Sequence, residues 1–307
     1  MANNILVALD NSEGAWGAVA YVAQTFAKTP AVQVTLLHIL PGLPPAFWDH
    51  GHIIASPAEQ KSLQRLVDNW ETEQEKQWQS LMQKARNHLQ QAGIPEDAIT
   101  GRFKPKDFDV AEDILDEAEA GGFDTIVMGR RGLGRAKALL LGSVTNKVAQ
   151  KARGCAVTIV SNLRKINKIL VPLDFDADYQ TIFPLAKDLA ARHNASLLLL
   201  YVAPPVTMFP SFYVNIHMAN FEAEVQVTAR ERMLALVQDF FADFPRLETR
   251  VELGYPADKI LQTAEQEEID LIVLGTHGRQ GIERAVFGSV AFKVVQSANC
   301  TIVTLHP

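Results

Sequence analysis

The segments Thr125-Ile-Val-Met-Gly-Arg-Arg-Gly132 and Leu271-Ile-Val-Leu-Gly-Thr-His-Gly278 share one pattern, an apolar run followed by two glycines. Each segment is followed by nine residues and then by a further match, Gly142-Ser143 in the first half of the chain and Gly288-Ser289 in the second. This order is typical of a buried strand, a glycine turn and a helix start, where backbone N–H groups can approach a phosphate. Two copies at the same internal spacing predict that the chain contains one α/β unit twice.

The two halves also correspond outside this motif. Asn4-Ile-Leu-Val-Ala-Leu-Asp10 matches Lys168-Ile-Leu-Val-Pro-Leu-Asp174, and the continuous apolar runs at 32–39 and 195–202 suit parallel strands buried on both faces. Further strands are expected at 99–103, 125–128 and 156–160, and at 248–253, 271–274 and 301–305. Helices are expected at 15–28, 57–91, 111–120 and from Ser143, and at 179–193, 219–241, 257–267 and from Ser289.

Strands that alternate with helices predict a parallel sheet with right-handed crossover connections. The expected fold is α/β, with two repeated, doubly wound, parallel five-stranded sheet domains. The 307 residues, 48% of them hydrophobic, are enough to give each domain its own core. We place the domains at 1–162 and 163–307, and the short linker near 161–167 predicts that they pack together.

The long helix expected at 57–91 carries apolar residues at roughly helical spacing, from Leu63, Leu66 and Trp70 to Trp78 and Leu89. Such a stripe is typical of a helix that packs one face against a core and leaves its charged face in water. We therefore expect the stripe to be chiefly core-facing.

The charge and the apolar runs exclude several classes of protein. A net charge of −6 provides no basic excess to neutralise a phosphate backbone, so we expect no nucleic-acid partner. Met1 leads into a strand without the pattern of a signal peptide, and the longest apolar run, 197–203, is too short to span a bilayer. We expect a cytoplasmic protein without a membrane partner. Cys155 and Cys300 each precede a last strand, and we expect buried free thiols there.

The residues at the carboxyl ends of the strands predict a phosphate-binding site in each half. Ligands of open parallel sheets bind outside these ends, where the strand order reverses. Asp10 ends the first strand and Gly129 the fourth, and the second half repeats the pair as Asp174 and Gly275. The carboxylate can accept a hydrogen bond from a ribose hydroxyl or an adenine amino group. The serine after each last glycine is expected to cap its helix, whose free N–H groups favour an anion.

Other motifs narrow this interpretation. No G-x-x-x-x-G-K-[ST] motif occurs, and Lys137 stands where a dinucleotide fingerprint that begins at Gly132 requires its third glycine. Side chains beside the glycines can add positive charge near a phosphate tail. They are Arg130, Arg131, His277 and Arg279. The alternative is that the glycines serve only tight turns and close helix–sheet contacts.

The doubled motif resembles that of the universal stress protein family in its tandem two-domain form. Nucleotide-binding members carry G-x2-G-x9-G-[ST] after a strand, and both copies here match every fixed position. The resemblance covers nearly the whole chain. It implies an ATP-binding domain of the adenine nucleotide alpha hydrolase-like type, with strand order 3-2-1-4-5, and pairing of the two domains through their last strands.

By family correspondence, the resemblance also implies which residues contact the nucleotide. In the first half they are Ala8, Asp10, Ile39, Met128, Gly129, Gly132, Gly142, Ser143, Val144 and Thr145. In the second half they are Pro172, Asp174, Val202, Leu274, Gly275, Gly278, Gly288, Ser289 and Val290.

The two copies differ in ways that bear on affinity. Asp10 is followed by Asn11-Ser12, close to the family pattern, whereas Asp174 is followed by Phe175-Asp176, a second carboxylate that can hold Mg²⁺ beside ATP. Thr145 offers a hydroxyl that Ala291 lacks at the matching place. We expect the first site to bind nucleotide at least as tightly as the second.

The resemblance indicates an ATP- or adenine-nucleotide-binding regulatory protein of the stress response, with no evident catalytic constellation. One alternative is a weak Mg²⁺-dependent ATP hydrolase in which Asp10 or Asp174 positions the metal or water. Another is a nucleotide-free dimeric scaffold in which the glycines only serve packing. The expected partners are the nucleotide and, within the chain, the other domain, and a dimer of chains is left open.

Overall fold

The computed structural model describes residues 3–40, 42, 57–107, 109–131, 141–161, 163–175, 177, 179–205, 218–276 and 287–305. The first half contains β1 (Asn4–Ala8), α1 (Glu13–Phe26), β2 (Gln33–Leu40), α3 (Pro57–Ala92), β3 (Ile99–Pro105), α4 (Val110–Gly121), β4 (Thr125–Gly129), α5 (Ser143–Lys151) and β5 (Ala156–Val160). The second half contains β6 (Lys168–Leu173), α6 (Tyr179–His193), β7 (Ser196–Ala203), α7 (Met218–Phe241), β8 (Leu247–Leu253), α8 (Pro256–Gln266), β9 (Leu271–Gly275), α9 (Ser289–Ser297) and β10 (Thr301–Leu305).

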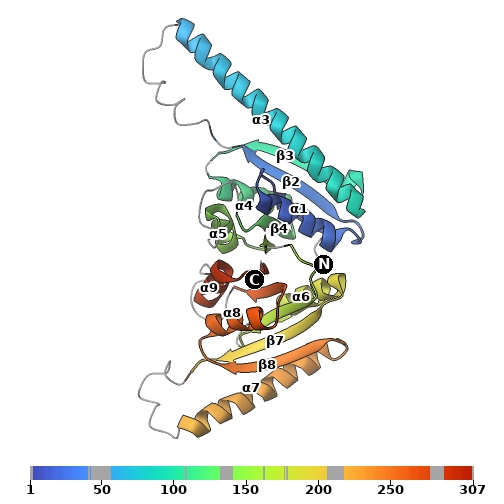
Figure 1. The fold of residues 1–307 in the computed structure, drawn as a ribbon, viewed down its shortest axis with the longest axis vertical. Coiled ribbons are helices and arrows are strands. Elements are labelled where there is room, and N and C mark those ends of the chain that lie inside the picture. The colour runs from blue at the N-terminus through green and yellow to red at the C-terminus, as the bar shows by residue number, and fades with distance from the viewer. Residues whose placement is uncertain are drawn as a thin grey trace.

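The strands form one ten-stranded sheet in the order β3-β2-β1-β4-β5-β10-β9-β6-β7-β8 (Figure 1). Within each half all neighbours are parallel, and each half has the order 3-2-1-4-5 when its strands are numbered from its own start. The α/β fold class and the strand order expected from the sequence are therefore confirmed. The order reverses between β1 and β4, and between β6 and β9, which places a switch point in each half.

The halves meet through their last strands. β5 and β10 pair antiparallel, with Ile302 opposite Ile159 and Leu305 opposite Ala156. This pairing makes one continuous sheet of the two halves, and it leaves neither β5 nor β10 as an open edge. The pairing of domains that the family resemblance implied is thus present within the chain.

Helices cover both faces of the sheet, and each face has its own core. On one face α1, α3, α6 and α7 pack against residues such as Ile5 and Val7, and on the other α4, α5, α8 and α9 pack against residues such as Leu6. Successive side chains of a strand point to opposite faces, so a strand covered on both sides must be apolar at every position. This explains the continuous apolar runs of the sequence.

The long helix α3 is only partly core-facing. Its C-terminal half is buried at Trp78 and Leu89, and it packs on β3 where Gly101 leaves space for Met82. Its N-terminal half extends away from the sheet (Figure 1), and Leu66 is 55% exposed there. The expectation of a chiefly core-facing stripe is therefore wrong for this half, because periodicity identifies the apolar face of a helix but not whether anything covers it.

Two further expectations concern the cysteines and the membrane. Both thiols are free, with Cys155 buried and Cys300 partly buried. Burial raises the pKa of Cys155 to about 11 and that of Cys300 to about 12. Among the described residues, no helix has the length and apolar character that crossing a membrane requires.

Candidate functional site

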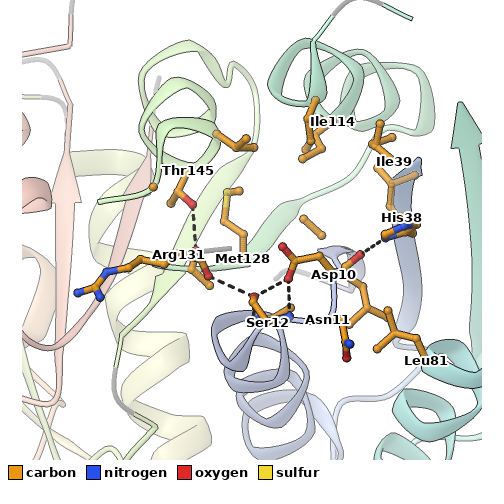
Figure 2. Close-up of a pocket in the computed structure, with 18 of the residues that line it drawn as sticks. Asp10, Asn11, Ser12, His38, Ile39, Leu81, Ile114, Met128, Arg131 and Thr145 are labelled. Atoms are coloured by element: carbon orange, nitrogen blue, oxygen red, sulfur yellow. Dashed lines mark hydrogen bonds between the residues drawn. The ribbon is translucent and has the colours of Figure 1, made fainter. Parts of the chain in front are cut away.

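A cavity of about 1270 Å³ opens at the switch point of the first half, where β1, β2 and β4 end and α1 and α5 begin (Figure 2). It collects every described first-half residue that the family resemblance assigned to the nucleotide. These are Ala8, Asp10, Ile39, Met128, Gly129, Gly142, Ser143, Val144 and Thr145. Gly132 lies outside the described residues.

Asp10 follows β1 and is held in place by Ser12, the residue before α1. Its Oδ1 accepts hydrogen bonds from the backbone N–H of Ser12, at 3.0 Å, and from the Ser12 hydroxyl (Figure 2). Ser12 is also the N-cap of α1, and its Oγ accepts from Ala15 N at 3.1 Å. The carboxylate is therefore fixed in direction, while Asp10 Oδ2 makes no hydrogen bond to the part of the chain that the structure describes and can accept one from a ligand.

The opposite side of the cavity is the first turn of α5. Gly142 is the N-cap, with φ −62° and ψ 145°, and it makes no side-chain cap. Ser143 is the first helical residue, and Ser289 occupies the same place in α9, so the expectation that these serines cap their helices is wrong. The first N–H groups of the helix are therefore not taken by a cap side chain, and they lie at the positive end of its dipole.

Thr145 shapes the same turn. Its buried hydroxyl donates to Gly129 O at 2.9 Å, which ties α5 to the end of β4 (Figure 2). Gly142 N donates to Arg130 O at 2.9 Å and adds a second tie. The strand end and the helix start are thus fixed relative to each other.

The first glycine of the motif is required by packing. A Cβ atom on Gly129 would be 2.2 Å from the carbonyl carbon of Gly14, so the first turn of α1 lies directly against the end of β4. Gly142 is less crowded, since its Cβ would be 3.3 Å from Arg130 O. The packing alternative therefore explains Gly129 fully, whereas packing is a weaker requirement at Gly142, which also lines the cavity.

Apolar side chains form the walls between the carboxylate and the helix start. Val110 and Ile114 of α4 join Ile39 and Met128 on one side. Trp78 of α3 stacks on His38 with ring centroids 5.5 Å apart, and Leu81 lies beside them at the cavity. Sequence reasoning assigned the α3 residues to the core and did not assign those of α4 to the site, because helical periodicity does not distinguish a core wall from a pocket wall.

Two residues of the cavity come from the other domain. Gln296 and Ser297, at the C-terminal end of α9, line it together with the first turn of α5. Nothing in the sequence pattern of the first half indicates this contribution. It follows from the β5–β10 pairing, which brings the helices beside the two last strands together.

The second half has the same order of strands and helices, but larger side chains follow its first strand. Phe175 stands where the first half has Asn11, and its ring centroid lies 4.1 Å from that of Tyr201. The Arg232 guanidinium lies over the Phe175 ring, 4.5 Å from its centroid. The hydroxyl of Tyr179, which corresponds to Ala15, donates to Asp174 O. Aromatic residues therefore stand at the two positions where the first half has Asn11 and Ala15.

The remaining second-half residues keep their expected places in the fold. Pro172 lies in β6, Val202 in β7, Leu274 and Gly275 at the end of β9, and Gly288, Ser289 and Val290 at the start of α9. A Cβ atom on Gly275 would be 2.6 Å from Ile182 Cδ1, so this glycine too faces a packed helix. Gly278, His277, Arg279 and Asp176 lie outside the described residues.

The described residues contain no group of three or more histidine, cysteine or acidic side chains placed to hold a metal ion. Arg131 lines the cavity on its glycine side, where its backbone carbonyl accepts a hydrogen bond from Ser12 Oγ at 3.3 Å, while its guanidinium points away from Asp10 (Figure 2). The chemical character of the site is thus one fixed carboxylate, one helix N-terminus, and an apolar space between them.

Comparison with known proteins agrees with the presence of two similar domains in the chain. The model of the universal stress protein family matches residues 1–161 and 165–306. A universal stress protein of Mycolicibacterium smegmatis is 25% identical over 307 residues, covering 99% of this chain and 97% of that protein. The universal stress protein Sll1388 of Synechocystis is 28% identical over 149 residues, which are 45% of this chain and 97% of that protein.

Solved structures show the same fold. The crystal structure of a universal stress protein from Archaeoglobus fulgidus superposes with a TM-score of 0.68 at 18% identity, covering 99% of this chain and 98% of that one. Because the family model matches both halves, the chain belongs to the universal stress protein family, as two family domains in tandem.

Proposed function

We propose that the first half binds an adenine nucleotide, ATP with or without Mg²⁺, in the cavity between Asp10 and the start of α5, and that the protein acts as a nucleotide-dependent regulator in the stress response. The observation that carries this proposal is the placement of a fixed carboxylate and a helix N-terminus on opposite sides of one cavity. The carboxylate suits the base or ribose of a nucleotide, which can donate hydrogen bonds to it. The helix N-terminus suits the phosphate tail, which accepts hydrogen bonds from its N–H groups.

The chemistry of the lining supports the fit. Asp10 Oδ2 can accept from a ribose hydroxyl or the adenine amino group, and the apolar walls at Ile39, Ile114 and Met128 suit the faces of a planar base. The N–H groups of the first turn of α5 suit phosphate oxygens. The cavity of about 1270 Å³ has room for a ligand of this size, since small-molecule sites commonly measure about 300–1,000 Å³.

The second half supports a weaker site. Its backbone frame at Gly275 and Gly288 is the same, but Phe175 and Tyr179 bring rings to the positions of Asn11 and Ala15. We therefore propose that nucleotide occupies the first half before the second. Binding to the folded state alone stabilises it by mass action, so occupancy reports the nucleotide level to any partner of the folded chain.

Equilibrium binding of a fluorescent ATP analogue to matched variants tests this proposal. We expect Asp10→Ala to weaken the first binding phase by about 10-fold to 100-fold, the range for loss of a hydrogen bond to a charged group. Asp174→Ala is the matched control and is expected to leave that phase unchanged. Equal effects of the two variants, or no binding by the unmodified protein, would contradict it.

The alternative function, a weak ATP hydrolase, predicts a different result. The protein would release phosphate from ATP steadily and above background, and Asp10→Asn would abolish this release. Binding without such release is the outcome expected of a regulator.

A further inference from the structure

Arg130 reaches across the boundary between the two domains. Its guanidinium donates a hydrogen bond to the main-chain carbonyl of Gln296, in the last turn of α9, and lies 3.5 Å from the hydroxyl of Ser161. The side chain is partly buried, and burial lowers the pKa of the guanidinium. An arginine remains charged despite such a shift, so a cation is held at the C-terminal end of α9, where the helix dipole favours it.

The backbone of the same residue belongs to the glycine loop of the first site. Arg130 N donates to Val160 O at 2.8 Å, and Arg130 O accepts from Gly142 N at 2.9 Å. Arg130 is therefore bonded to the last strand of its own domain, to the N-cap of α5 and to α9 of the other domain. The residue that reaches α9 thus also belongs to the loop that fixes the start of α5.

The second half repeats these backbone bonds. Thr276 N donates to Leu305 O at 3.2 Å, and Gly288 N donates to Thr276 O at 3.0 Å. Thr276 Oγ1, however, donates to Leu305 O of its own domain at 3.2 Å. Where the first half has the Arg130 guanidinium, the second half thus has a threonine hydroxyl that donates within its own domain.

The last turns of α5 and α9 also receive their guanidinium groups from different domains. Gln150 of α5 corresponds to Gln296 of α9, and its carbonyl accepts from Arg153 of its own domain at 3.1 Å. Position 299, which corresponds to Arg153, is an asparagine. The last turn of α9 therefore receives from the other domain the guanidinium that α5 receives from its own.

We propose that the first-half site is a two-domain site, in which Arg130 is a positioning residue that makes nucleotide binding depend on α9. Gln296 and Ser297 of α9 line the cavity, and Arg130 holds that helix end against the loop that orients α5. Nucleotide at the first site and the docked position of α9 then stabilise each other, as linkage requires. Gly288 is the N-cap of α9 and lies about 13 Å along the helix from Ser297, so the second-half site is coupled to the first through the same element. This proposal rests on the proposed function for its ligand.

Two measurements on the full chain test the proposal, with Arg130→Ala and Arg130→Lys as variants and Arg153→Ala as the matched control. Arg153→Ala also removes a guanidinium from a helix C-terminal carbonyl, but within one domain. For ATP binding by calorimetry, we expect Arg130→Ala to weaken the first site about tenfold, within the range of typical coupling between sites. Arg130→Lys is expected to lose less affinity, and Arg153→Ala none.

The second measurement needs no nucleotide. Hydrogen exchange of the amides of Val294 to Ala298 in α9, and of Gly142, is expected to quicken in Arg130→Ala and to remain unchanged in Arg153→Ala. If the unmodified protein does not bind ATP, the proposed function fails, and the exchange experiment still decides whether Arg130 couples the domains. Identical exchange and identical affinity in the two alanine variants would overturn the proposal.

Discussion

Gly14 and Gly129 lie backbone against backbone, because a Cβ atom on Gly129 would be 2.2 Å from the carbonyl carbon of Gly14. The contact continues one step further, since a Cβ atom on Gly14 would be 2.2 Å from Arg131 O. The first turn of α1 therefore lies on the glycine loop itself. One arrangement serves two purposes, as it packs the helix on the sheet and brings Ser12 beside Asp10.

This contact predicts that Gly129→Ala destabilises the protein in the absence of any nucleotide. The added methyl group forces backbone to move from backbone, and overpacking of this kind costs about 1–3 kcal/mol. Urea unfolding followed by circular dichroism measures the loss. Gly42→Ala is the control, because a Cβ there meets nothing within 4 Å, and it is expected to change stability by less than about 0.5 kcal/mol. Equal stability of the two variants would show that the close approach is wrong.

The Thr145 hydroxyl predicts a second effect on stability. In Thr145→Val the carbonyl of Gly129 loses its donor in a buried place, which costs about 1–3 kcal/mol. Thr145→Ser retains the hydroxyl and is expected to be the more stable of the two variants, although it lacks the methyl group. Chemical unfolding of both variants checks the order, and a valine variant more stable than the serine variant would contradict it.

The contact between α1 and α6 predicts a dependence of stability on pH. His193 is buried, its Nε2 lies 3.1 Å from Thr25 Oγ1 of the other domain, and burial, with Arg192 second, lowers its pKa to about 4. The folded state thus binds a proton less readily than the unfolded state, whose histidine has a pKa near 6.5. Stability contributed by neutral His193 is fully present above about pH 6.5 and is lost as the pH falls toward 4.

The slope of unfolding free energy between pH 6.5 and 4 measures this effect. We expect His193→Gln to flatten this slope, because the variant loses the pH-dependent contribution of His193 to the unfolding free energy. That contribution is at most about 1.4 kcal/mol for each unit by which folding lowers the pKa of His193. An unchanged slope in His193→Gln would place the proton uptake on other groups.

Glu267 contributes in a lower pH range. Hydrogen bonds from Lys168 and Arg250 lower its pKa to about 2, so its contribution to stability is lost from about pH 4.5 downward.

The two cysteines predict low thiol reactivity. Burial is the main cause that raises the pKa of both thiols, so the thiolate that reacts with disulfide reagents is scarce at neutral pH. A colorimetric thiol assay is expected to label neither residue rapidly in the folded protein and to label both after denaturation. Rapid labelling of Cys155 without unfolding would show that its neighbourhood opens.

Much of this fold follows from sequence because the local signals agree with one another. Continuous apolar runs bounded by glycine or aspartate identify the strands, and α6 occurs at Tyr179–His193, where periodicity placed it. The doubled motif further identifies the end of β4 and the start of α5 as parts of one site, and the cavity includes both. Even so, the N-cap was assigned to Ser143 instead of Gly142, because capping depends on backbone angles that composition does not fix.

The features that sequence reasoning missed depend on distant contacts. Phe175 is visible in the sequence as a substitution, but its stacking on Tyr201 under Arg232 depends on where β7 and α7 lie. The bond from Arg130 to Gln296 leaves no pattern, because its acceptor is a main-chain carbonyl that every residue possesses. The exposed end of α3 was missed for a related reason, as burial requires a covering element as well as an apolar face.

The most direct test of the central claim is calorimetric titration with Mg-ATP of the full chain, freed of bound nucleotide by unfolding and refolding. We predict heat that saturates first at one equivalent, and loss of this phase in Gly142→Val but not in Gly288→Val, since Gly142 is the N-cap of the helix at the first-half cavity. Absence of both heat and thermal stabilisation at millimolar ATP would contradict the claim. Loss of the phase in Gly288→Val alone would assign the nucleotide to the second half instead.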